Sequence, residues 1–386
     1  MFICELCGQS DFIFELRLDN YPLTNVYLDT QNSSNEYLKD AVLFQCNCGH
    51  VQLNSQHDCE SIYVNDYPYD GEAPTVQSRR EKGVSLIRKY LKLESPSYIV
   101  DIGCGQLSMI NRLGDFYRKS KLIAMDPVPL KFENMNARVE FINDYFRGQL
   151  KCVKNSGGQN LFILDNVLEH IHGVSSFMEN ISLNTNLGDL VYVCVPSFDV
   201  ICTNLQFHEI IHEHRHYYTL DKLNSLFRRY GFHLIESFSN YENSRAYNYH
   251  LFVKGKKSDH GYAEGIPFRP ISNRVELYSK TLRTCLENIN LLSQPIWGVC
   301  ASELTPTLAY FMGSNLDFCS GIFDTSAQKV GKYMVNVTPK ITPMNQIEET
   351  ALDSYFFITA PSLTYPVLQN LDRFNRKSVI FPQFLV

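Results

Sequence analysis

A turn that contains two glycines is the first candidate binding site in the sequence. It has the pattern D-x-G-x-G, runs from Asp101 to Gly105, and joins an apolar run to a helical pattern that begins near Ser108. Because Gly103 and Gly105 have no Cβ, a ligand can lie directly against the backbone, facing the free N–H groups of the helix. A second apolar run ends in Asp126, whose carboxylate suits the two hydroxyls of a ribose. We therefore expect a nucleoside-binding turn, and a tight turn that binds nothing is the alternative.

The spacing of the glycines distinguishes this turn from a dinucleotide fingerprint. Ser108 stands where that fingerprint has its third glycine. The pattern resembles motif I of the class I S-adenosylmethionine methyltransferases, whose ligand is a nucleoside with an amino-acid tail and no pyrophosphate. This resemblance implies S-adenosylmethionine as the cofactor, with Cys104 and Pro127 as further contacts beside the glycines and Asp126.

Two close pairs of cysteines near the N-terminus predict a metal site. The four residues are Cys4, Cys7, Cys46 and Cys48. Two such pairs in a short module can supply a closed tetrahedral metal site. A module of this size has a small hydrophobic core and needs a bound metal or a cross-link to be stable. The second pair is tighter than the usual C-x-x-C, so His50 or Cys59 can replace one thiolate. We expect one structural zinc ion, and buried free thiols are the alternative.

A histidine-rich segment at residues 207–220 offers a second possible metal site. His208, Glu209 and His212 satisfy the H-E-x-x-H pattern, which in zinc proteases puts two metal ligands on one helix. No third ligand is evident at the spacing of those proteases, so we assign no catalytic metal here. A loop at residues 63–71 is rich in Tyr, Pro, Gly and Asp, and its phenols could hydrogen-bond a carbonyl or a phosphate.

The elements that must position these groups alternate between helices and strands. Residues 78–91 predict a helix, and apolar runs predict strands near residues 98–102, 122–125, 139–142, 161–164 and 190–195. Such alternation predicts an α/β fold with a doubly wound parallel sheet, which binds ligands at the carboxyl ends of its strands. Asp144 and Tyr145 follow the third strand, where we expect them to meet the adenine. Asn166 and His170 follow the fourth, where we expect them near the sulfonium.

The length and composition of the chain indicate its number of domains, the partners it excludes and its cellular compartment. A chain of 386 residues predicts several domains, which we place at residues 1–75, 76–254 and 271–386, the last a second, smaller α/β unit after a polar linker. The net charge of -6, without a basic block, argues against nucleic acid as a partner. No apolar run is long enough to span a bilayer, and the first residues lack a signal-peptide pattern. We expect a cytoplasmic protein whose 12 Cys are thiols or metal ligands.

Nearly the whole chain resembles the deoxysugar C-methyltransferases, which make branched sugars. Three N-terminal segments carry the resemblance: the C-x-x-C-G at residues 4–8, Pro-Leu-Thr-Asn at 22–25, and the stretch from Cys48 to Leu53. The central signature of that family is approximately Tyr-His-Glu-His followed by an aromatic pair, and residues 211–218 are similar to it. Ile211 stands where a tyrosine is common, and the second cysteine pair is C-x-C where the family usually has C-x-x-C.

The resemblance implies a zinc module, a class I methyltransferase domain and a Rossmann-like C-terminal domain. It also implies methylation at C3 of a nucleotide-linked 4-keto-deoxysugar (TDP-, GDP- or CDP-linked) through an enolate. In this reading His214, largely neutral because its reference pKa is about 6.5, is the base, and Glu213 orients the sugar or assists protonation. Tyr67 or Tyr69 faces the ketone oxygen. The alternatives are a sugar O- or N-methyltransferase and a non-catalytic scaffold in glycan assembly.

The C-terminal domain keeps only Gly298 of the family's glycine-rich turn. The lost glycines argue against a second nucleotide site there. We expect this domain to pack against the others or to form a wall of the sugar cleft.

Overall fold

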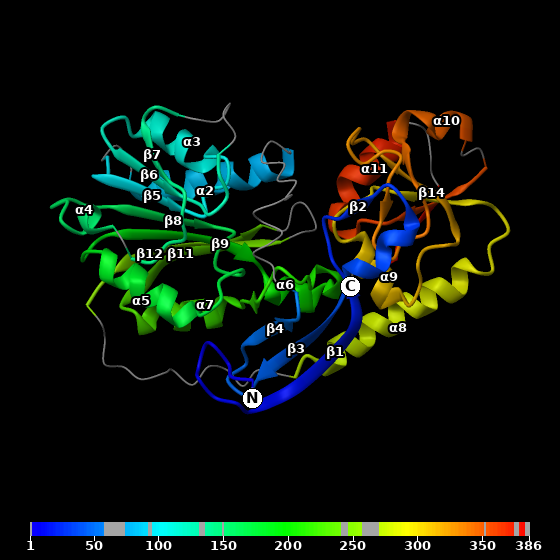
Figure 1. The fold of residues 1–386 in the computed structure, drawn as a ribbon, viewed down its shortest axis with the longest axis horizontal. Coiled ribbons are helices and arrows are strands. Elements are labelled where there is room, and N and C mark those ends of the chain that lie inside the picture. Colours follow the sequence, from blue (N-terminus) through cyan, green and yellow to red (C-terminus); the bar gives the residue numbers. More distant parts are fainter. Residues whose placement is uncertain are drawn as a thin grey trace.

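The computed structural model describes residues 2–57, 74–91, 95–130, 136–148, 150–240, 246–256, 270–350, 353–373 and 378–382. Two α/β units lie side by side, and a small N-terminal sheet lies at their junction (Figure 1). None of the helices in these ranges is long and apolar enough to cross a membrane.

The central unit is a seven-stranded sheet with the order β11-β12-β9-β8-β5-β6-β7. Its strands are β5 (Tyr98–Ile102), β6 (Lys121–Met125), β7 (Val139–Ile142), β8 (Leu161–Asp165), β9 (Leu190–Pro196), β11 (Phe232–Asn240) and β12 (Tyr247–Lys254). The predicted strands from β5 to β9 are confirmed and run parallel. The complete sheet is mixed, because β12 is antiparallel to both β9 and β11. The connection from β11 to β12 is too short for a crossover, which forces that pair into a hairpin.

Helices cover both faces of this sheet, as the alternation predicted. They are α2 (Pro74–Leu91), α3 (Ser108–Phe116), α4 (Lys151–Lys154), α5 (Val174–Asn184) and α7 (Leu220–Arg229). A further helix, α6 (Phe198–Thr203), contributes Phe198 and Ile201 to a different core. Side chains alternate along each strand, so Ile99 belongs to the core under α2 and α3, while Val100 belongs to the core under α5 and α7. The sheet is therefore buried on both faces, and only its strand ends are available to ligands.

The C-terminal unit repeats this design on a smaller scale. Its parallel sheet has the order β16-β14-β13-β17-β18, which matches the order β7-β6-β5-β8-β9 of the central sheet. The strands are β13 (Ile296–Val299), β14 (Cys319–Asp324), β16 (Ile341–Pro343), β17 (Tyr355–Ile358) and β18 (Val379–Ile380). The helices are α8 (Ser272–Ile289), α9 (Thr305–Met312), α10 (Ile347–Thr350) and α11 (Thr364–Arg373). The second α/β sheet expected from the sequence is thus present.

The N-terminal segment forms a sheet that the sequence analysis did not predict. It contains β1 (Phe12–Pro22), β3 (Leu38–Cys46) and β4 (Val51–Ser55), and β10 (His216–Tyr217) of the central unit completes it. A short strand, β2 (Tyr27–Leu28), pairs with β15 (Tyr333–Met334) of the C-terminal unit. The first half of β1 alternates between half-buried and exposed residues, and Glu15 and Arg17 interrupt its apolar residues, so the sequence offers no long apolar run there.

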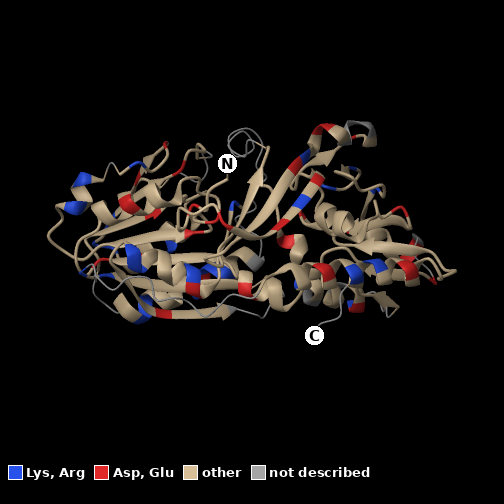
Figure 2. Ribbon diagram, turned by 90° about the horizontal axis from the view of Figure 1, so that it is seen from below, with Lys and Arg blue, Asp and Glu red and all other residues tan. Residues whose placement is uncertain are grey.

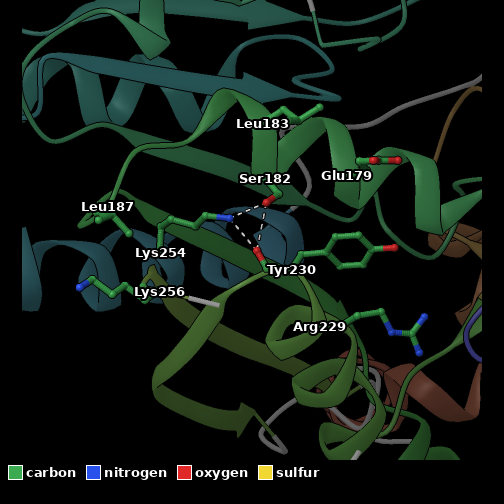
Figure 3. A pocket seen from close by; sticks show the side chains of 9 residues that line it. Glu179, Ser182, Leu183, Leu187, Arg229, Tyr230, Lys254 and Lys256 are labelled. Atoms are coloured by element: carbon green, nitrogen blue, oxygen red, sulfur yellow. Dashed lines mark hydrogen bonds between the residues drawn. The ribbon is translucent and has the colours of Figure 1, made fainter. Parts of the chain in front are cut away.

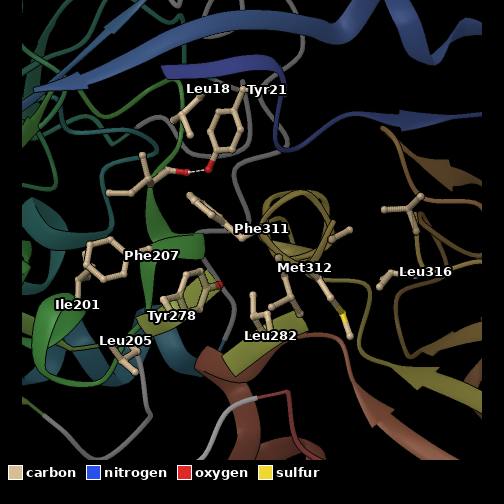
Figure 4. Close-up of a cluster of buried hydrophobic side chains, with 14 of the residues drawn as sticks. Leu18, Tyr21, Ile201, Leu205, Phe207, Tyr278, Leu282, Phe311, Met312 and Leu316 are labelled. Carbon is tan, nitrogen blue, oxygen red and sulfur yellow. Dashed lines mark hydrogen bonds between the residues drawn. The ribbon is translucent and has the colours of Figure 1, made fainter. Parts of the chain in front are cut away.

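One hydrophobic core joins all three parts. It brings together Leu18 and Tyr21 from β1, Phe207 from the central unit, and Tyr278 and Phe311 from the C-terminal unit (Figure 4). The buried Tyr21 hydroxyl donates a 2.5 Å hydrogen bond to the carbonyl oxygen of Ile210. Because the core is shared, the histidine-rich segment that follows Phe207 is fixed by all three parts at once.

Candidate functional site

The glycine turn after β5 has the backbone that a close ligand requires. Gly103 has φ of 70° and Gly105 has φ of 53°, in the left-handed region that favours glycine. The Gly103 and Cys104 N–H groups donate to the Met125 carbonyl at 2.8 and 3.2 Å, which ties the turn to β6. A Cβ on Gly103 would lie 2.5 Å from a methyl carbon of Val167, so packing also requires glycine here.

Asp126 holds this turn and remains able to bind a ligand. Its Oδ2 accepts from the Gly105 N–H at 2.8 Å, and its Oδ1 accepts from the Val128 N–H at 2.9 Å. Burial raises the pKa of Asp126, and these two bonds partly offset that rise. Each carboxylate oxygen can accept a second hydrogen bond, so ribose hydroxyls can still bind.

Buried acceptors gather where β5 and β8 end. Asp101 Oδ2, Asp165 Oδ1 and Asn166 Oδ1 are buried, and no donor among the described residues reaches them. On the other side of Asp165, the Arg79 guanidinium from α2 lies 3.2 Å from Oδ2. The buried Arg80 Nε lies 3.6 Å from the same oxygen. Buried acceptors normally have partners, and the α-ammonium of a bound amino-acid tail would supply donors to Asp101, Asp165 and Asn166. Sequence reasoning missed Asp165 and Arg79, although Asp165 directly precedes the predicted Asn166.

The residues predicted to meet the adenine lie at the outer strands of the same edge. Asp144 accepts from the Tyr145 N–H at 2.8 Å and from Arg147 Nη1 at 2.9 Å. The Asn143 amide joins the ends of β6 and β7 by donating to the carbonyls of Asp126 and Pro127, each at 2.9 Å. Their contacts with adenine stay a prediction. The buried Cys104 packs beneath the turn.

Glu213 is the central acid of the predicted catalytic segment. It is buried, and the Thr24 hydroxyl from the N-terminal part lies 3.0 and 3.2 Å from its two carboxylate oxygens. Burial raises the pKa of Glu213 to about 7, and its hydrogen bonds offset only part of that rise. A carboxyl group with such a pKa can donate or accept a proton near neutral pH. No sequence signal singled out Thr24 as its partner.

His214 lies against a second histidine. The ring centroids of His214 and His170 are 4.8 Å apart, with an angle of 70° between the planes. His170 Nδ1 lies 2.8 Å from the Glu213 carbonyl oxygen and must donate to it. This bond leaves His170 Nε2 as the nitrogen with a lone pair. The structure therefore places His170 beside the predicted base, and its contact with the cofactor stays a prediction.

The other histidines of the segment have structural contacts. His212 Nε2 lies 3.0 Å from the Tyr21 carbonyl and Nδ1 lies 2.7 Å from Ser55 Oγ, and burial lowers the His212 pKa to about 4. His208 instead contacts Tyr278 and Ser362 through its two ring nitrogens. The 3₁₀ helix η3 (Phe207–Glu209) ends before His212, so the H-E-x-x-H residues do not share a helix. The zinc-protease alternative has no support in this geometry.

The four predicted cysteine ligands come together at one end of the N-terminal sheet. Their sulfurs all lie within 4.8 Å of one another, and the Cys4–Cys48 and Cys7–Cys46 pairs are 3.8 and 3.5 Å apart. A tetrahedral zinc site with Zn–S bonds of about 2.3 Å has edges of about 3.8 Å, so the donor set fits zinc. His50 is not part of this group of four donors, and its Nε2 lies 3.0 Å from His216 Nδ1.

Glu5 links the cysteine cluster to the central unit. It lies between Cys4 and Cys7, and its Oε2 accepts from the Gly173 and Val174 N–H groups at 2.7 and 3.2 Å, where α5 begins. The His216 ring is 3.4 Å from the same oxygen. Despite burial, these partners lower the pKa of Glu5 to about 2. The cluster is therefore connected to the strand that directly follows His214.

Two of the predicted catalytic residues, Tyr67 and Tyr69, lie outside the described residues, as does Cys59. A separate hollow of about 420 Å³ is lined by Ser182, Leu187, Tyr230 and Lys254 (Figure 3). Lys254 Nζ already donates to Ser182 Oγ and to the Tyr230 carbonyl at 2.5 and 2.6 Å. Leu187 precedes the amino end of β9, so this hollow is at the edge of the sheet opposite the candidate site.

Comparison with known families decides the class of enzyme. Residues 76–237 match the family described as a methyltransferase domain, and residues 253–383 match a C-methyltransferase C-terminal domain. The protein is an S-adenosylmethionine-dependent methyltransferase. The second match shows that a domain of the C-methyltransferase C-terminal family follows the methyltransferase domain in the sequence. No curated protein matches this methyltransferase in sequence.

Two solved methyltransferase structures are among those similar to part of this chain. The 1,6-didemethyltoxoflavin-N1-methyltransferase of Burkholderia thailandensis is 16% identical, with 52% of this chain and 86% of that chain covered and a TM-score of 0.37. The N-methyltransferase NodS of Bradyrhizobium japonicum is 13% identical, with coverage of 50% and 95% and a TM-score of 0.37. The mixed sheet of the methyltransferase is typical of class I enzymes.

Proposed function

We propose that the enzyme methylates C3 of a nucleotide-linked 4-keto-deoxysugar. The observation that carries the proposal is the buried pair of Glu213 and His214 beside the strand ends, in a chain whose last domain is of the C-methyltransferase type. Carbon is a poor nucleophile, so C-methylation needs a base, and this cluster supplies candidates. The nucleotide, TDP, GDP or CDP, is left open.

The residues of the cluster suit an enolate mechanism. The ketone at C4 acidifies the C3 hydrogen, and His214 takes this proton with a ring nitrogen. The electrons of the C3–H bond form the C3–C4 double bond, and negative charge moves to the ketone oxygen. S-adenosylmethionine, which the turn of Gly103 and Gly105 and the Asp126 carboxylate would hold, would supply a methyl group activated by its sulfonium. C3 would take this methyl with the electrons of the C3–C4 double bond, the ketone would re-form, and the methyl–sulfur bond would break to release S-adenosylhomocysteine.

Glu213 provides the group that can stabilise the enolate oxygen. With a pKa of about 7 it is partly protonated near neutral pH, and a buried carboxylic acid can donate to a developing oxyanion. Thr24 fixes its orientation through both oxygens. Tyr67 or Tyr69 remains our proposed second donor to this oxygen.

We also propose that the cysteine cluster binds one structural zinc ion. The spacing of the sulfurs supports this assignment, and the cluster is closed by four protein ligands, so it would serve stability and not methyl transfer. We further propose a small-molecule acceptor and not nucleic acid. Lys and Arg are interspersed with Asp and Glu over the described chain, without a basic stripe, which supports this choice (Figure 2).

A product analysis tests the function. The enzyme would be incubated with [methyl-¹³C]S-adenosylmethionine and a panel of nucleotide-linked 4-keto-deoxysugars, and products would be identified by NMR. We expect a methyl carbon coupled to C3 and stable to acid hydrolysis. Methyl transfer to a hydroxyl, or to sugars that lack a ketone, would replace the enolate mechanism with O-methylation.

A further inference from the structure

Glu169 is a buried acid for which the mechanism above has no role. It follows β8 directly before His170, and its side chain is 1% exposed. Its backbone carbonyl accepts from the N–H groups of Arg215 and His216 at 2.8 and 3.1 Å. These two bonds hold residue 169 against the segment that follows His214.

A third bond fixes the neighbouring side chain. His170 Nδ1 donates to the Glu213 carbonyl at 2.8 Å, so residues 169–170 are tied to both sides of His214. A carboxylate oxygen of Glu169, a nitrogen of His170 and a nitrogen of His214 all lie within 4.8 Å of one another. Side-chain rotation can close such a distance to a direct hydrogen bond, as catalytic contacts often do when ligands bind.

A carboxylate in this place has a definite effect on a basic histidine. When His214 takes a proton it becomes a buried cation, which a nearby carboxylate stabilises while it also orients the ring. Two further titratable groups in the described chain sense the Glu169 charge, namely Tyr218 and Cys194. Burial raises the pKa of each well above its usual value, so both are neutral near pH 7 and do not compensate the carboxylate.

We propose that Glu169 is a positioning residue whose carboxylate orients His214 and stabilises its imidazolium. The inference rests on the proposed role of His214 as the base. A metal ion on the same three side chains would occupy the lone pair that proton abstraction needs, and we therefore favour the carboxylate–histidine pair.

The test is an NMR titration of ¹³C-labelled histidine in the full-length protein, with His214 assigned by the His214→Asn variant. Glu169→Gln should lower the pKa of His214 by about one unit or more, since it removes the neighbouring charge. Glu179→Gln is the matched control, because it removes the same charge from an exposed position at a distance, and it should leave this pKa unchanged. Glu169→Asp keeps the charge and should recover most of the shift.

Substrate exchange gives a second readout. With S-adenosylhomocysteine bound, Glu169→Gln should slow exchange of the C3 hydrogen with D₂O about 10–100-fold and move the acid limb of the pH profile downward. If the wild type shows no exchange, the proposed function fails, but the titration still tests the pairing of Glu169 with His214.

Two results would overturn the inference. One is an equal His214 pKa in the wild type and Glu169→Gln. The other is a stoichiometric Co²⁺ spectrum that Glu169→Gln abolishes while Cys4→Ser retains it, which would make the cluster a metal site. Should Glu169→Gln not fold, the wild-type pKa of His214 decides together with that in Glu213→Gln: a pKa below the reference of about 6.5 would overturn the inference, and a pKa that stays above it when the neighbouring Glu213 charge is removed would support it.

Discussion

The Thr24 hydroxyl lies 3.0 and 3.2 Å from the two carboxylate oxygens of Glu213, although the residues are 189 positions apart in the chain. The N-terminal part therefore completes the candidate active site and does not only carry the cysteine cluster. Because a hydrogen bond to the ionised form favours that form, Thr24 keeps the pKa of Glu213 lower than burial alone would.

Removing this hydroxyl should change the pH dependence of the reaction. Thr24→Val should raise the pKa of Glu213 further above about 7, so the pH-rate limb that depends on this acid should move to higher pH. Thr24→Ser keeps the hydroxyl and should behave as the wild type. Profiles of kcat against pH check this, and coincident Val and Ser profiles would mean that Thr24 does not control Glu213.

Glu213 should also make stability depend on pH. Its folded pKa of about 7 exceeds the unfolded value of 4.5, so the folded state binds more protons between these values and loses stability as pH rises through this window. The free energy of unfolding of Glu213→Gln, relative to that of the wild type, should therefore be higher at pH 8 than at pH 4. The change between the two pH values should be up to about 3 kcal/mol. Urea unfolding at the two pH values measures this difference, and a pH-independent offset would contradict it.

His214→Asn should separate binding from chemistry. General bases typically contribute about 10²–10⁴-fold, so the variant should lose rate on this scale while binding both ligands nearly normally. It should also lose exchange of the C3 hydrogen with D₂O in the presence of S-adenosylhomocysteine. Wild-type exchange in the variant would show that another residue is the base, with Tyr67, Tyr69 and Glu213 as the next candidates.

Two acids with the same backbone contacts provide a matched test of cofactor binding. The Asp126 carboxylate accepts hydrogen bonds from the N–H groups of Gly105 and Val128 at 2.8 and 2.9 Å. The Asp324 carboxylate of the C-terminal unit accepts from the N–H groups of Ala301 and Ser326, both at 2.8 Å. Asp126→Ala should weaken S-adenosylmethionine binding about 10-fold or more, since a hydrogen bond to a charged group contributes about 1.5–3 kcal/mol.

Asp324→Ala is the control, because it removes the same type of turn contact from the other sheet. It should leave the affinity for S-adenosylmethionine unchanged. Calorimetric titration of both variants, each checked for folding, decides the matter. Equal losses in the two would indicate general destabilisation and not a ribose contact.

The cysteine cluster should prove to be a zinc site that supports the central unit. Elemental analysis should find about one zinc ion per chain in the wild type. The Cys4→Ser, Cys7→Ser double variant should lack it and unfold more easily. Glu5→Ala should keep the zinc and lose about 1 kcal/mol, because α5 loses the acceptor for its first N–H groups. Full zinc occupancy in the double variant would locate the metal elsewhere.

The sequence by itself determined the parts that depend on local pattern. Apolar runs located the strands from β5 to β9, and the glycine turn located the candidate cofactor edge, because strand ends and left-handed turns are set by neighbouring residues. The cysteine cluster could also be predicted in part, because local geometry brings the two sulfurs of each close pair together. The methyltransferase class followed from the resemblance of the glycine turn to motif I of the class I methyltransferases.

Only the tertiary structure decided which distant groups meet. Thr24 reaches Glu213 because β4 pairs with β10 and because the shared core packs Tyr21 against Ile210. Glu169 and His170 meet His214 through backbone bonds between two loops that no periodicity predicts. The antiparallel β12 and the N-terminal sheet escaped prediction for a related reason. Strand pairing and long-range side-chain contacts depend on packing between segments far apart in sequence, and local propensity does not identify the partner segment.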